Sequence, residues 1–484
     1  MSGDWKRPWG DDPRIARALE LLQQVATEQQ QDLQRVQPAD PQRVSAYDER
    51  LKQFAELRGG GLYYPYLATG RGNGPWVELG DGSVKLDFIS GIGVHGAGHG
   101  DAGLRAAGIE AAMLDTVMQG NLQQFDVAVD LCQRLVDLAC ESGADLRHVT
   151  LSTSGAMANE NALKLAFHHG PGRPRLVAFE HCFAGRTLAL SQLTDKAAYR
   201  VGLPPTLSVD YLPFFDTNDP AGSTGRTLAA LETIVARYPQ QHAAIWVELI
   251  QGEGGYNVGD TNFLRLLSQR ARDAGMVVIF DEVQTFGRTT RPFAFQHFGL
   301  DDLVDVVTIG KISQACATLY RPAFKPGPGL ISQTFTAGTW EILAALEILD
   351  RFDSIGSFGA GGRNQRIHER FSSGLEKLAE QYPGSISGPW GIGGMLALTP
   401  LDGSAAVAKR LAELCFEEGL MGFVAGAEPT RLRFLPPLLV VTDEQIDEAL
   451  RLLEQAARPI VGRAKEVSGS QTVSATRRNP APCW

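Results

Sequence analysis

The sequence predicts an α/β fold, with a mostly parallel sheet in a large domain and a smaller α+β domain after it. Short apolar runs rich in β-branched residues show little polar alternation, as expected of strands that are buried on both faces. Amphipathic stretches such as 227–238 and 263–274 separate most of these runs, which is typical of a parallel sheet covered by helices. The predicted strands are 148–151, 175–179, 244–247, 277–280 and 306–309.

The chain divides into four predicted parts. They are an N-terminal arm with a segment that packs on the small domain (1–85), the large domain (86–345), the small C-terminal domain (346–465) and a loose tail rich in Ser, Thr, Arg and Pro (466–484). The arm is polar, with a helical stretch over 15–36. Thr442 and Gln445 have the spacing of a capping box, which predicts the start of the last helix.

Composition limits the classes of function. Hydrophobic residues make up 44% of the 484 residues, so the chain is not disordered, and a net charge of −10 argues against a nucleic-acid partner. Neither a signal peptide nor a membrane-spanning apolar stretch is recognisable. The six cysteines are scattered and no zinc motif occurs, so we expect reduced thiols in a cytoplasmic protein without a bound metal.

An aspartate and a lysine follow two of the predicted strands. Asp281 comes directly after the run 277–280, and Lys311 follows shortly after the run 306–309. In parallel sheets, ligand groups gather at the carboxyl ends of the strands. The pair meets the needs of a pyridoxal phosphate (PLP) enzyme, because a lysine amine binds the aldehyde of this cofactor and a carboxylate pairs with its protonated ring nitrogen.

Three further blocks also follow predicted strands. Ser154-Gly155-Ala156 opens a helix expected over 159–168, where backbone N–H groups favour an anion, although an ordinary strand-to-helix turn would have the same sequence. Phe183 could stack on an aromatic ring or pack in the core. The loop from Glu248 to Gly255 carries two glutamates after a very apolar strand, which favours a site over a solvated turn.

Together these blocks resemble the class III aminotransferases, PLP-dependent enzymes of the ornithine, 4-aminobutyrate and acetylornithine type. The resemblance runs over residues 62–456 and implies PLP fold type I. Blocks in the family's order are far more specific than any one of them. They are Ser154-Gly155-Ala156, Phe183-Ala184-Gly185-Arg186-Thr187, Glu248 to Gly255, Asp281-Glu282-Val283-Gln284-Thr285 and Gly310-Lys311.

The resemblance implies a role for each block. Lys311 should hold PLP as a Schiff base and move a proton during the reaction, which requires its amine to be partly neutral. Asp281 should pair with the ring nitrogen. The other expected cofactor contacts are Ser154, Gly155 and Ala156 at the phosphate, Phe183 stacked on the ring, Val283 behind it, Gln284 at the phenolic oxygen, and Glu248 in the neighbouring loop.

The resemblance also implies a homodimer with shared active sites. A threonine of the partner subunit reaches the phosphate in this family, and we prefer Thr334 over Thr336 because an aromatic residue follows it. Arg433 resembles the arginine that binds the substrate α-carboxylate. Glu253 resembles the glutamate that pairs with this arginine when an ω-amino substrate has no carboxylate there. The implied substrates are a small amine or amino-acid donor and a 2-oxo acid such as 2-oxoglutarate or pyruvate.

The sequence departs from the family pattern around the expected substrate pocket. Ile312-Ser313-Gln314-Ala315-Cys316 follows Lys311 where glycines are usual, and this run is similar to the lysine 6-aminotransferase branch. Met157, Ala184 and Leu249 replace a usual Glu, His and Pro. The expected cofactor contacts are intact, so these changes bear on which substrate is used.

Three hypotheses follow from these observations. The leading one is a PLP-dependent ω-aminotransferase. A racemase, epimerase or decarboxylase on the same scaffold would use the same lysine and aspartate, but Glu253 with Arg433 favours amino transfer. A non-catalytic protein that keeps the fold is the third, and the departures after Lys311 motivate it.

Overall fold

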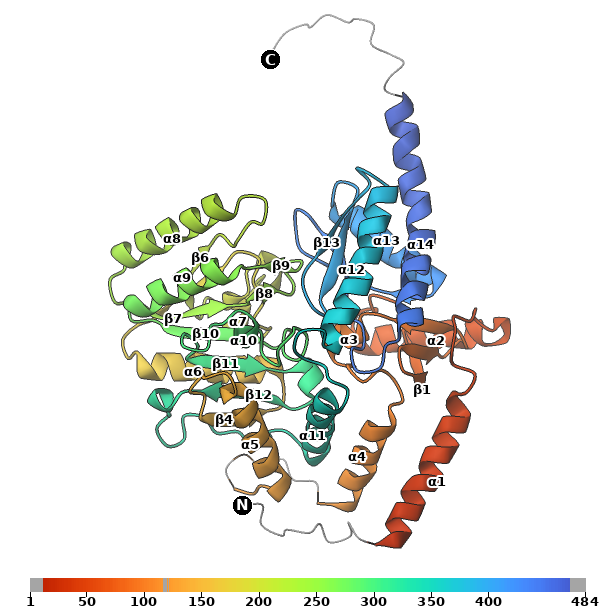
Figure 1. Ribbon diagram of the computed structural model, residues 1–484, viewed down its shortest axis with the longest axis horizontal. Helices are drawn as coiled ribbons and strands as arrows, with labels where there is room; N and C mark the ends of the chain where they lie inside the picture. Colours follow the sequence, from red (N-terminus) through yellow and green to blue (C-terminus); the bar gives the residue numbers. More distant parts are fainter. Residues whose placement is uncertain (1–11, 116–119, 121, 471–484) are drawn as a thin grey trace, which may run out of the picture.

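A seven-stranded sheet forms the centre of the largest part of the molecule (Figure 1). The computed structural model describes residues 12–115, 120 and 122–470. The strand order is β4-β12-β11-β10-β7-β5-β6. The bounds are β4 His148–Ser152, β5 Arg175–Phe179, β6 Ser208–Leu212, β7 His242–Val247, β10 Val277–Glu282, β11 Val306–Ile309 and β12 Cys316–Tyr320.

The predicted mostly parallel sheet is confirmed. β12 runs antiparallel to both β11 and β4, whereas the other neighbouring strands pair in parallel. Every residue of β7, β10 and β11 is buried, which explains their continuous apolar runs. Asp281 lies opposite Thr308 in the β10–β11 pair, so the ends of these two strands, and Lys311 just after β11, meet at one edge of the sheet.

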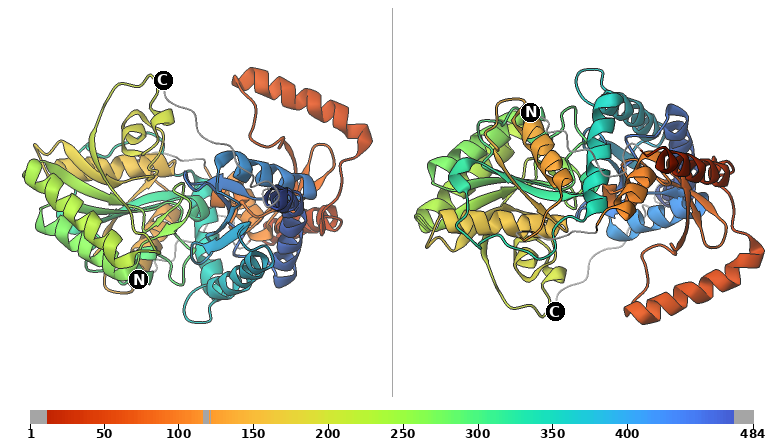
Figure 2. Two further views of the ribbon diagram at one scale, coloured as in Figure 1. Left: turned by 90° about the horizontal axis from the view of Figure 1, so that it is seen from above. Right: turned by 90° about the horizontal axis from the view of Figure 1, so that it is seen from below.

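Helices cover both faces of this sheet. In the view from above, α6 lies on one side of the strands, and α8 and α9 lie on the other (Figure 2). The helices of this part are α5 Asp126–Cys140, α6 Gly155–His169, α7 Leu188–Leu193, α8 Pro220–Arg237, α9 Thr261–Asp273, α10 Ala294–His297 and α11 Thr339–Ser354. Short elements complete it: 3₁₀ turns η1 Ala197–Tyr199, η2 Lys311–Ser313 and η3 Pro322–Phe324, and the strands β8 Ile250–Gln251 and β9 Asn257–Val258.

A second, antiparallel sheet and three helices form the C-terminal part. The sheet order is β13-β14-β17-β16. Its elements are α12 Arg363–Gln381, β13 Ile386–Trp390, β14 Leu396–Pro400, α13 Ala405–Glu418, β16 Phe423–Ala425, β17 Arg431–Phe434 and α14 Asp443–Ser470. The predicted capping box at the start of α14 is present, because the Thr442 N–H donates to Gln445 Oε1 at 2.9 Å and the Gln445 N–H donates to Thr442 Oγ1 at 3.4 Å.

The N-terminal segment joins the C-terminal part through a shared sheet. β15 (Leu420–Met421) pairs in parallel with β3 (Val84–Asp87), which continues into β2 (Trp76–Leu79) and β1 (Ala68–Asn73). The remaining N-terminal helices are α1 Pro13–Gln30, α2 Pro41–Arg58, α3 Ser90–Gly93 and α4 Ala102–Met113. α2 extends away from the rest of the molecule (Figure 2) and buries only Tyr47.

Some element boundaries differ from those expected. α6 begins at Gly155, earlier than the expected 159, because the Ser154 hydroxyl accepts a hydrogen bond from the Met157 N–H at 3.2 Å and caps the helix there. α1 ends at Gln30, before the expected 36. α14 continues to Ser470, into the predicted tail, and residues 471–484 lie outside the described part. The predicted division into four parts stays a prediction.

Candidate active site

A cavity of about 430 Å³ opens where β7, β10 and β11 end, a size typical of small-molecule sites. The chain brings nine of the predicted site residues to its wall. They are Gly155, Ala156, Phe183, Glu248, Glu253, Asp281, Val283, Gln284 and Lys311. Ser154 precedes this group at the cap of α6, and Arg433 contacts it through Glu253 and Gln284. Thr334 does not line the cavity.

Lys311 opens the 3₁₀ turn η2 directly beyond β11. Its backbone has φ +56°, in the left-handed region that side chains other than glycine rarely adopt. Burial lowers the pKa of its amine to about 8, helped by the positive charge of Arg433 and opposed by Glu253 and Asp281. A sizeable fraction of Lys311 is therefore neutral near pH 8, as a lysine that binds a carbonyl or moves a proton requires.

Asp281 is held by three donors at the end of β10. The Asn159 amide donates to Oδ2 at 2.8 Å, the Val283 N–H donates to Oδ1 at 2.9 Å, and the Thr308 hydroxyl lies 3.5 Å from Oδ1. Burial raises the pKa of this carboxyl to about 6, and these hydrogen bonds act in the opposite direction. A positively charged ring nitrogen beside Asp281 would favour its ionised form further.

Asn159 is a site residue that the sequence interpretation missed. Its amide nitrogen donates to the Ala184 carbonyl at 2.7 Å as well as to Asp281. Asn159 on α6 thereby holds the Asp281 carboxylate of β10 in place. Its buried Oδ1 has no hydrogen-bond partner among the described residues. An asparagine on a helix gives no signal of this kind in the sequence, because its contact with Asp281 exists only in the folded chain.

The first turn of α6 has the features of an anion site. Its leading backbone N–H groups have no partner within the helix, and the helix dipole favours negative charge there. A Cβ on Gly155 would lie 2.7 Å from Val283 Cγ1, so only glycine allows this turn to approach the residue predicted to pack behind the ring. Ala156 is the next residue and lines the cavity.

Glu248 holds the loop that carries Phe183. Its carboxylate accepts hydrogen bonds from the Phe183 N–H at 2.8 Å and the Gly252 N–H at 3.0 Å. Burial raises the pKa of Glu248 to about 8, and the negative charge of Asp281 acts in the same direction. Glu248 therefore ties together two segments of the cavity wall, and Phe183 projects from one of them.

Glu253 and Arg433 form an ion pair beside Lys311 although they lie far apart in the sequence. Arg433 is fully buried on β17, where Nη2 donates to Glu253 and Nη1 donates to the Gly252 carbonyl at 3.1 Å. Although burial would raise the pKa of Glu253, the charge of Arg433 lowers it below its ordinary value. The Glu253 side chain keeps 24% exposure, whereas its partner Arg433 is fully buried.

Arg186 is a second cavity residue that was not predicted. Its guanidinium lies over the Tyr199 ring, 3.8 Å from the centroid, and Lys196 Nζ lies 4.8 Å from the same ring. Within the described chain Arg186 has no carboxylate partner, so it offers an unpaired cation to a ligand. Its position in the Phe-x-Gly-Arg-Thr block was the signal in the sequence.

The two candidate threonines lie elsewhere. Thr334 is exposed, and Thr336 is buried with an Oγ1 that has no hydrogen-bond partner in the described part of the chain. Thr336 lines a different cavity, together with Gln333 and Ile331. One chain therefore does not bring either threonine to Lys311, and the expected contact with a partner subunit stays a prediction.

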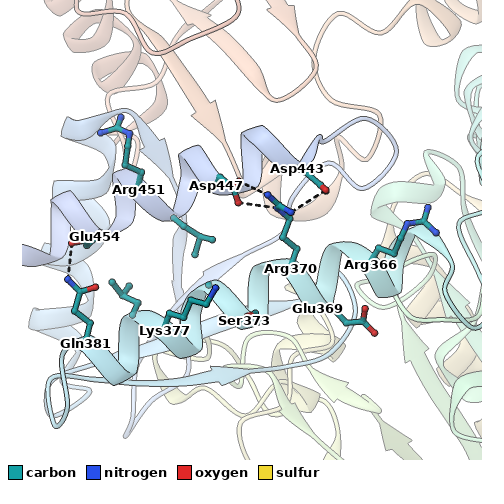
Figure 3. A pocket seen from close by; sticks show the side chains of 13 residues that line it. Arg366, Glu369, Arg370, Ser373, Lys377, Gln381, Asp443, Asp447, Arg451 and Glu454 are labelled. Atoms are coloured by element: carbon teal, nitrogen blue, oxygen red, sulfur yellow. Dashed lines mark hydrogen bonds and ion pairs between the residues drawn. The ribbon is translucent and has the colours of Figure 1, made fainter.

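Another hollow, of about 810 Å³, lies between α12 and α14 (Figure 3). Its polar and charged side chains pair across the groove: Arg370 Nη1 lies 3.3 Å from Asp443, and the Gln381 amide donates to Glu454 at 3.1 Å. It contains none of the predicted site residues. Among the described residues no cluster of metal-binding side chains occurs, and no described helix is long and apolar enough to cross a membrane.

The cavity residues fit PLP. A lysine and a carboxylate follow neighbouring strands, the start of α6 lines the same cavity, and Gly155 at that start leaves room that a side chain would fill. The Aminotransferase class-III family model matches residues 59–457. The chain belongs to the class-III aminotransferase family. These enzymes depend on PLP, so this aminotransferase is a PLP enzyme, as the sequence predicted.

Relatives of this class-III aminotransferase agree with the assignment. It is 32% identical over 411 residues to acetylornithine aminotransferase 1 of Bradyrhizobium diazoefficiens, covering 81% of this chain and 93% of the relative. It is 30% identical to an acetylornithine aminotransferase of Prochlorococcus marinus, covering 81% and 91%. The solved lysine aminotransferase of M. tuberculosis has the same fold, with a TM-score of 0.74 at 22% identity and coverage of 85% and 99%. The predicted fold type I and the leading hypothesis of a PLP-dependent aminotransferase are therefore confirmed.

Proposed function

We propose that this aminotransferase takes an amino group from the ω-carbon of a small amino acid and gives it to a 2-oxo acid such as 2-oxoglutarate or pyruvate. The observation that carries the proposal is the Glu253–Arg433 ion pair at the same cavity as Lys311. A donor that presents its ω-amino end has no carboxylate near Arg433, whereas a 2-oxo acid does. A glutamate that can pair with the arginine or leave it serves both substrates in one site.

The two guanidinium groups would divide the carboxylates between them. Arg186 would bind the distal carboxylate of the donor, because it is an unpaired cation on the cavity wall. Arg433 would bind the α-carboxylate of the acceptor once Glu253 has moved away. The names of the relatives support a donor of this kind, since acetylornithine and lysine each carry both a carboxylate and a nitrogen-bearing side chain.

The cofactor would be held by residues from several elements. Ser154, Gly155 and Ala156 would hold the phosphate, Phe183 and Val283 would lie on the two faces of the ring, and Asp281 would pair with its nitrogen. Gln284 would donate to the phenolic oxygen, and Glu248 would keep Phe183 in place through the backbone bond described above.

Lys311 would move the proton of the reaction. PLP, when bound, withdraws electrons from the donor carbon that carries the nitrogen, so that this carbon loses a proton more easily. The neutral Lys311 amine would take that proton from the donor and give it to the cofactor. The lowered pKa of Lys311 supports this role as a base. Asp281, ionised beside the ring nitrogen, would keep that nitrogen protonated.

We also propose a homodimer that works in the cytoplasm. Phe335 beside Thr334 is 59% exposed, Trp340 is 42% exposed and Leu122 is 87% exposed, which supports a partner surface around the predicted threonine contact. The five described cysteines are free thiols, which supports a reducing compartment.

A spectrophotometric half-reaction tests the proposal. The protein loaded with PLP is mixed with ω-amino acids, diamines and α-amino acids, and conversion of the cofactor to its aminated form is followed. We expect the fastest conversion with ω-amino acids, followed by glutamate formation when 2-oxoglutarate is added. Loss of substrate chirality or release of CO₂ without an aminated cofactor would contradict amino transfer and favour a racemase or decarboxylase.

A further inference from the structure

The turn that follows Lys311 is strained at both of its ends. Lys311 has φ +56°, and Gln314 has φ +60° and ψ −59°. The Ala315 N–H donates to the Ser313 carbonyl at 2.7 Å, so Gln314 is the central residue of a three-residue γ-turn of the rare positive-φ kind. Such conformations persist only where surrounding contacts impose them, and they concentrate at functional sites.

The Gln314 side chain supplies such a contact. Its Nε2 donates to the Val94 carbonyl at 3.0 Å and lies 3.4 Å from the carbonyl of Lys311 itself. It also lies 3.5 Å from the Ile312 carbonyl. Because all three neighbours are carbonyl oxygens, the amide nitrogen and not the amide oxygen faces them. One side chain therefore links the backbone of Lys311 to the segment that contains Val94, and Val94 and Gln314 both line the cavity.

A second contact holds the same turn from the other side. Ile312 is buried against Gly96, where a Cβ would lie 2.3 Å from Ile312 Cγ1. Gly96 in turn accepts a hydrogen bond from the Leu439 N–H at 3.0 Å. The segment from Val94 to Gly96 is thus a fixed support, and Ile312 and Gln314 are the two side chains by which the Lys311 turn rests on it.

We propose that Gln314 is a positioning residue that holds the Lys311 turn against the Val94 carbonyl and so fixes the direction from which the Lys311 amine meets the substrate. The proposal rests on the proposed role of Lys311. A glycine run after the lysine would adopt a positive φ without strain but would leave the turn free to move. In this chain Gln314 adopts the strained positive φ, and its side chain restricts the turn to one conformation.

The Gln314→Gly variant distinguishes the contribution of the Gln314 side chain from that of the backbone conformation. Glycine adopts the observed φ and ψ readily, so the turn can keep its path while the bond to Val94 is lost. We expect the rate of the amino-transfer half-reaction to fall about tenfold, with donor KM changed less than about twofold, because misplacement of a reacting group affects the chemical step. We also expect the pH at which the absorbance of the lysine-bound cofactor titrates to shift, while the melting temperature does not fall.

Gln240→Gly is the matched control. Gln240 also has a positive φ, of +57°, but is exposed in the turn before β7, so it reports the effect of the same substitution away from the cavity. Gln314→Glu is the second variant, because it keeps the length of the side chain and turns an acceptor toward the three carbonyls. We expect its rate to fall at least as much as that of Gln314→Gly.

The outcomes discriminate between the two proposals. If both Gln314 variants keep the wild-type rate and the wild-type pH titration, or if they lose only melting temperature, Gln314 is not a positioning residue. If the wild-type protein performs the half-reaction with α-amino acids but with no ω-amino acid, the proposed function fails, and the two Gln314 variants are then compared with the wild-type protein on the best α-amino donor. A slow, spectrally shifted Gln314→Gly beside an unchanged Gln240→Gly supports the proposal.

Discussion

Removing Glu253 tests how the ion pair with Arg433 works. In Glu253→Ala the fully buried guanidinium loses its carboxylate, and loss of one partner of a buried pair costs about 3–5 kcal/mol. Arg433 still has the Gly252 carbonyl at 3.1 Å and Gln284 Oε1 at 3.5 Å as acceptors, and the lost glutamate was partly exposed. We therefore expect the free energy of unfolding to fall by the lower end of this range, about 3 kcal/mol. Urea denaturation of the PLP-loaded protein measures it.

The same variant should bind the acceptor more tightly. The carboxylate of a 2-oxo acid no longer has to displace Glu253, so we expect its dissociation constant to fall at least about tenfold, which corresponds to about 1.4 kcal/mol. Excess 2-oxoglutarate should then recover part of the lost stability in Glu253→Ala, by about 2.7 kcal/mol at a concentration 100 times the dissociation constant. The half-reaction with ω-amino donors should slow, because Arg433 now lacks its partner in that step.

The matched control is Glu232→Ala on the exposed surface of α8, which we expect to change the free energy of unfolding by less than about 0.5 kcal/mol. An unchanged affinity of Glu253→Ala for 2-oxoglutarate would refute the idea that the glutamate and the acceptor compete for Arg433. A stability equal to that of Glu232→Ala would refute the buried ion pair itself.

The cavity supports three other predictions. Gly155→Ala would place a Cβ 2.7 Å from Val283 Cγ1, so the affinity for PLP, measured by absorbance titration, should fall about tenfold, and an unchanged affinity would contradict the close approach. Arg186→Met should raise the KM of carboxylate-bearing donors about tenfold or more and leave that of simple amines unchanged; equal effects on both would exclude a carboxylate site. In the cofactor-free protein, labelling of Lys311 by an amine reagent should be half-maximal near pH 8, and a midpoint near the ordinary 10.5 would contradict the lowered pKa. Because this folded-state pKa is depressed, burying Lys311 opposes folding at low pH, and this cost falls as the pH rises from about 8 to 10.5.

The sequence predicts well what depends on local pattern. Asp281 and Lys311 follow continuous apolar runs, and the ends of parallel strands necessarily meet at one edge, so their proximity follows from the strand assignment alone. The strand β12 was not predicted. It reverses the direction of the chain between two parallel neighbours, and nothing in its composition distinguishes an antiparallel strand in a buried sheet.

Contacts between distant segments were predicted only through the family resemblance. Glu253 and Arg433 come from a loop and a strand of different sheets, and no spacing rule joins them. Asn159 was missed because its contact with Asp281 depends on the rotation of α6, and Arg186 was missed although its block was recognised. The strain at Gln314 has no sequence signal except the absence of glycines after Lys311.

The Lys311→Ala variant decides whether Lys311 carries out the amino transfer. The wild-type protein and the variant are each loaded with PLP and mixed with the best ω-amino donor, and the absorbance of the cofactor is followed in a single turnover. We expect the wild-type protein to convert its cofactor to the aminated form and then to form glutamate from 2-oxoglutarate, whereas the variant lacks the absorbance of a lysine-bound cofactor and does not turn over. A Lys311→Ala variant that transfers amino groups at the wild-type rate would contradict this expectation.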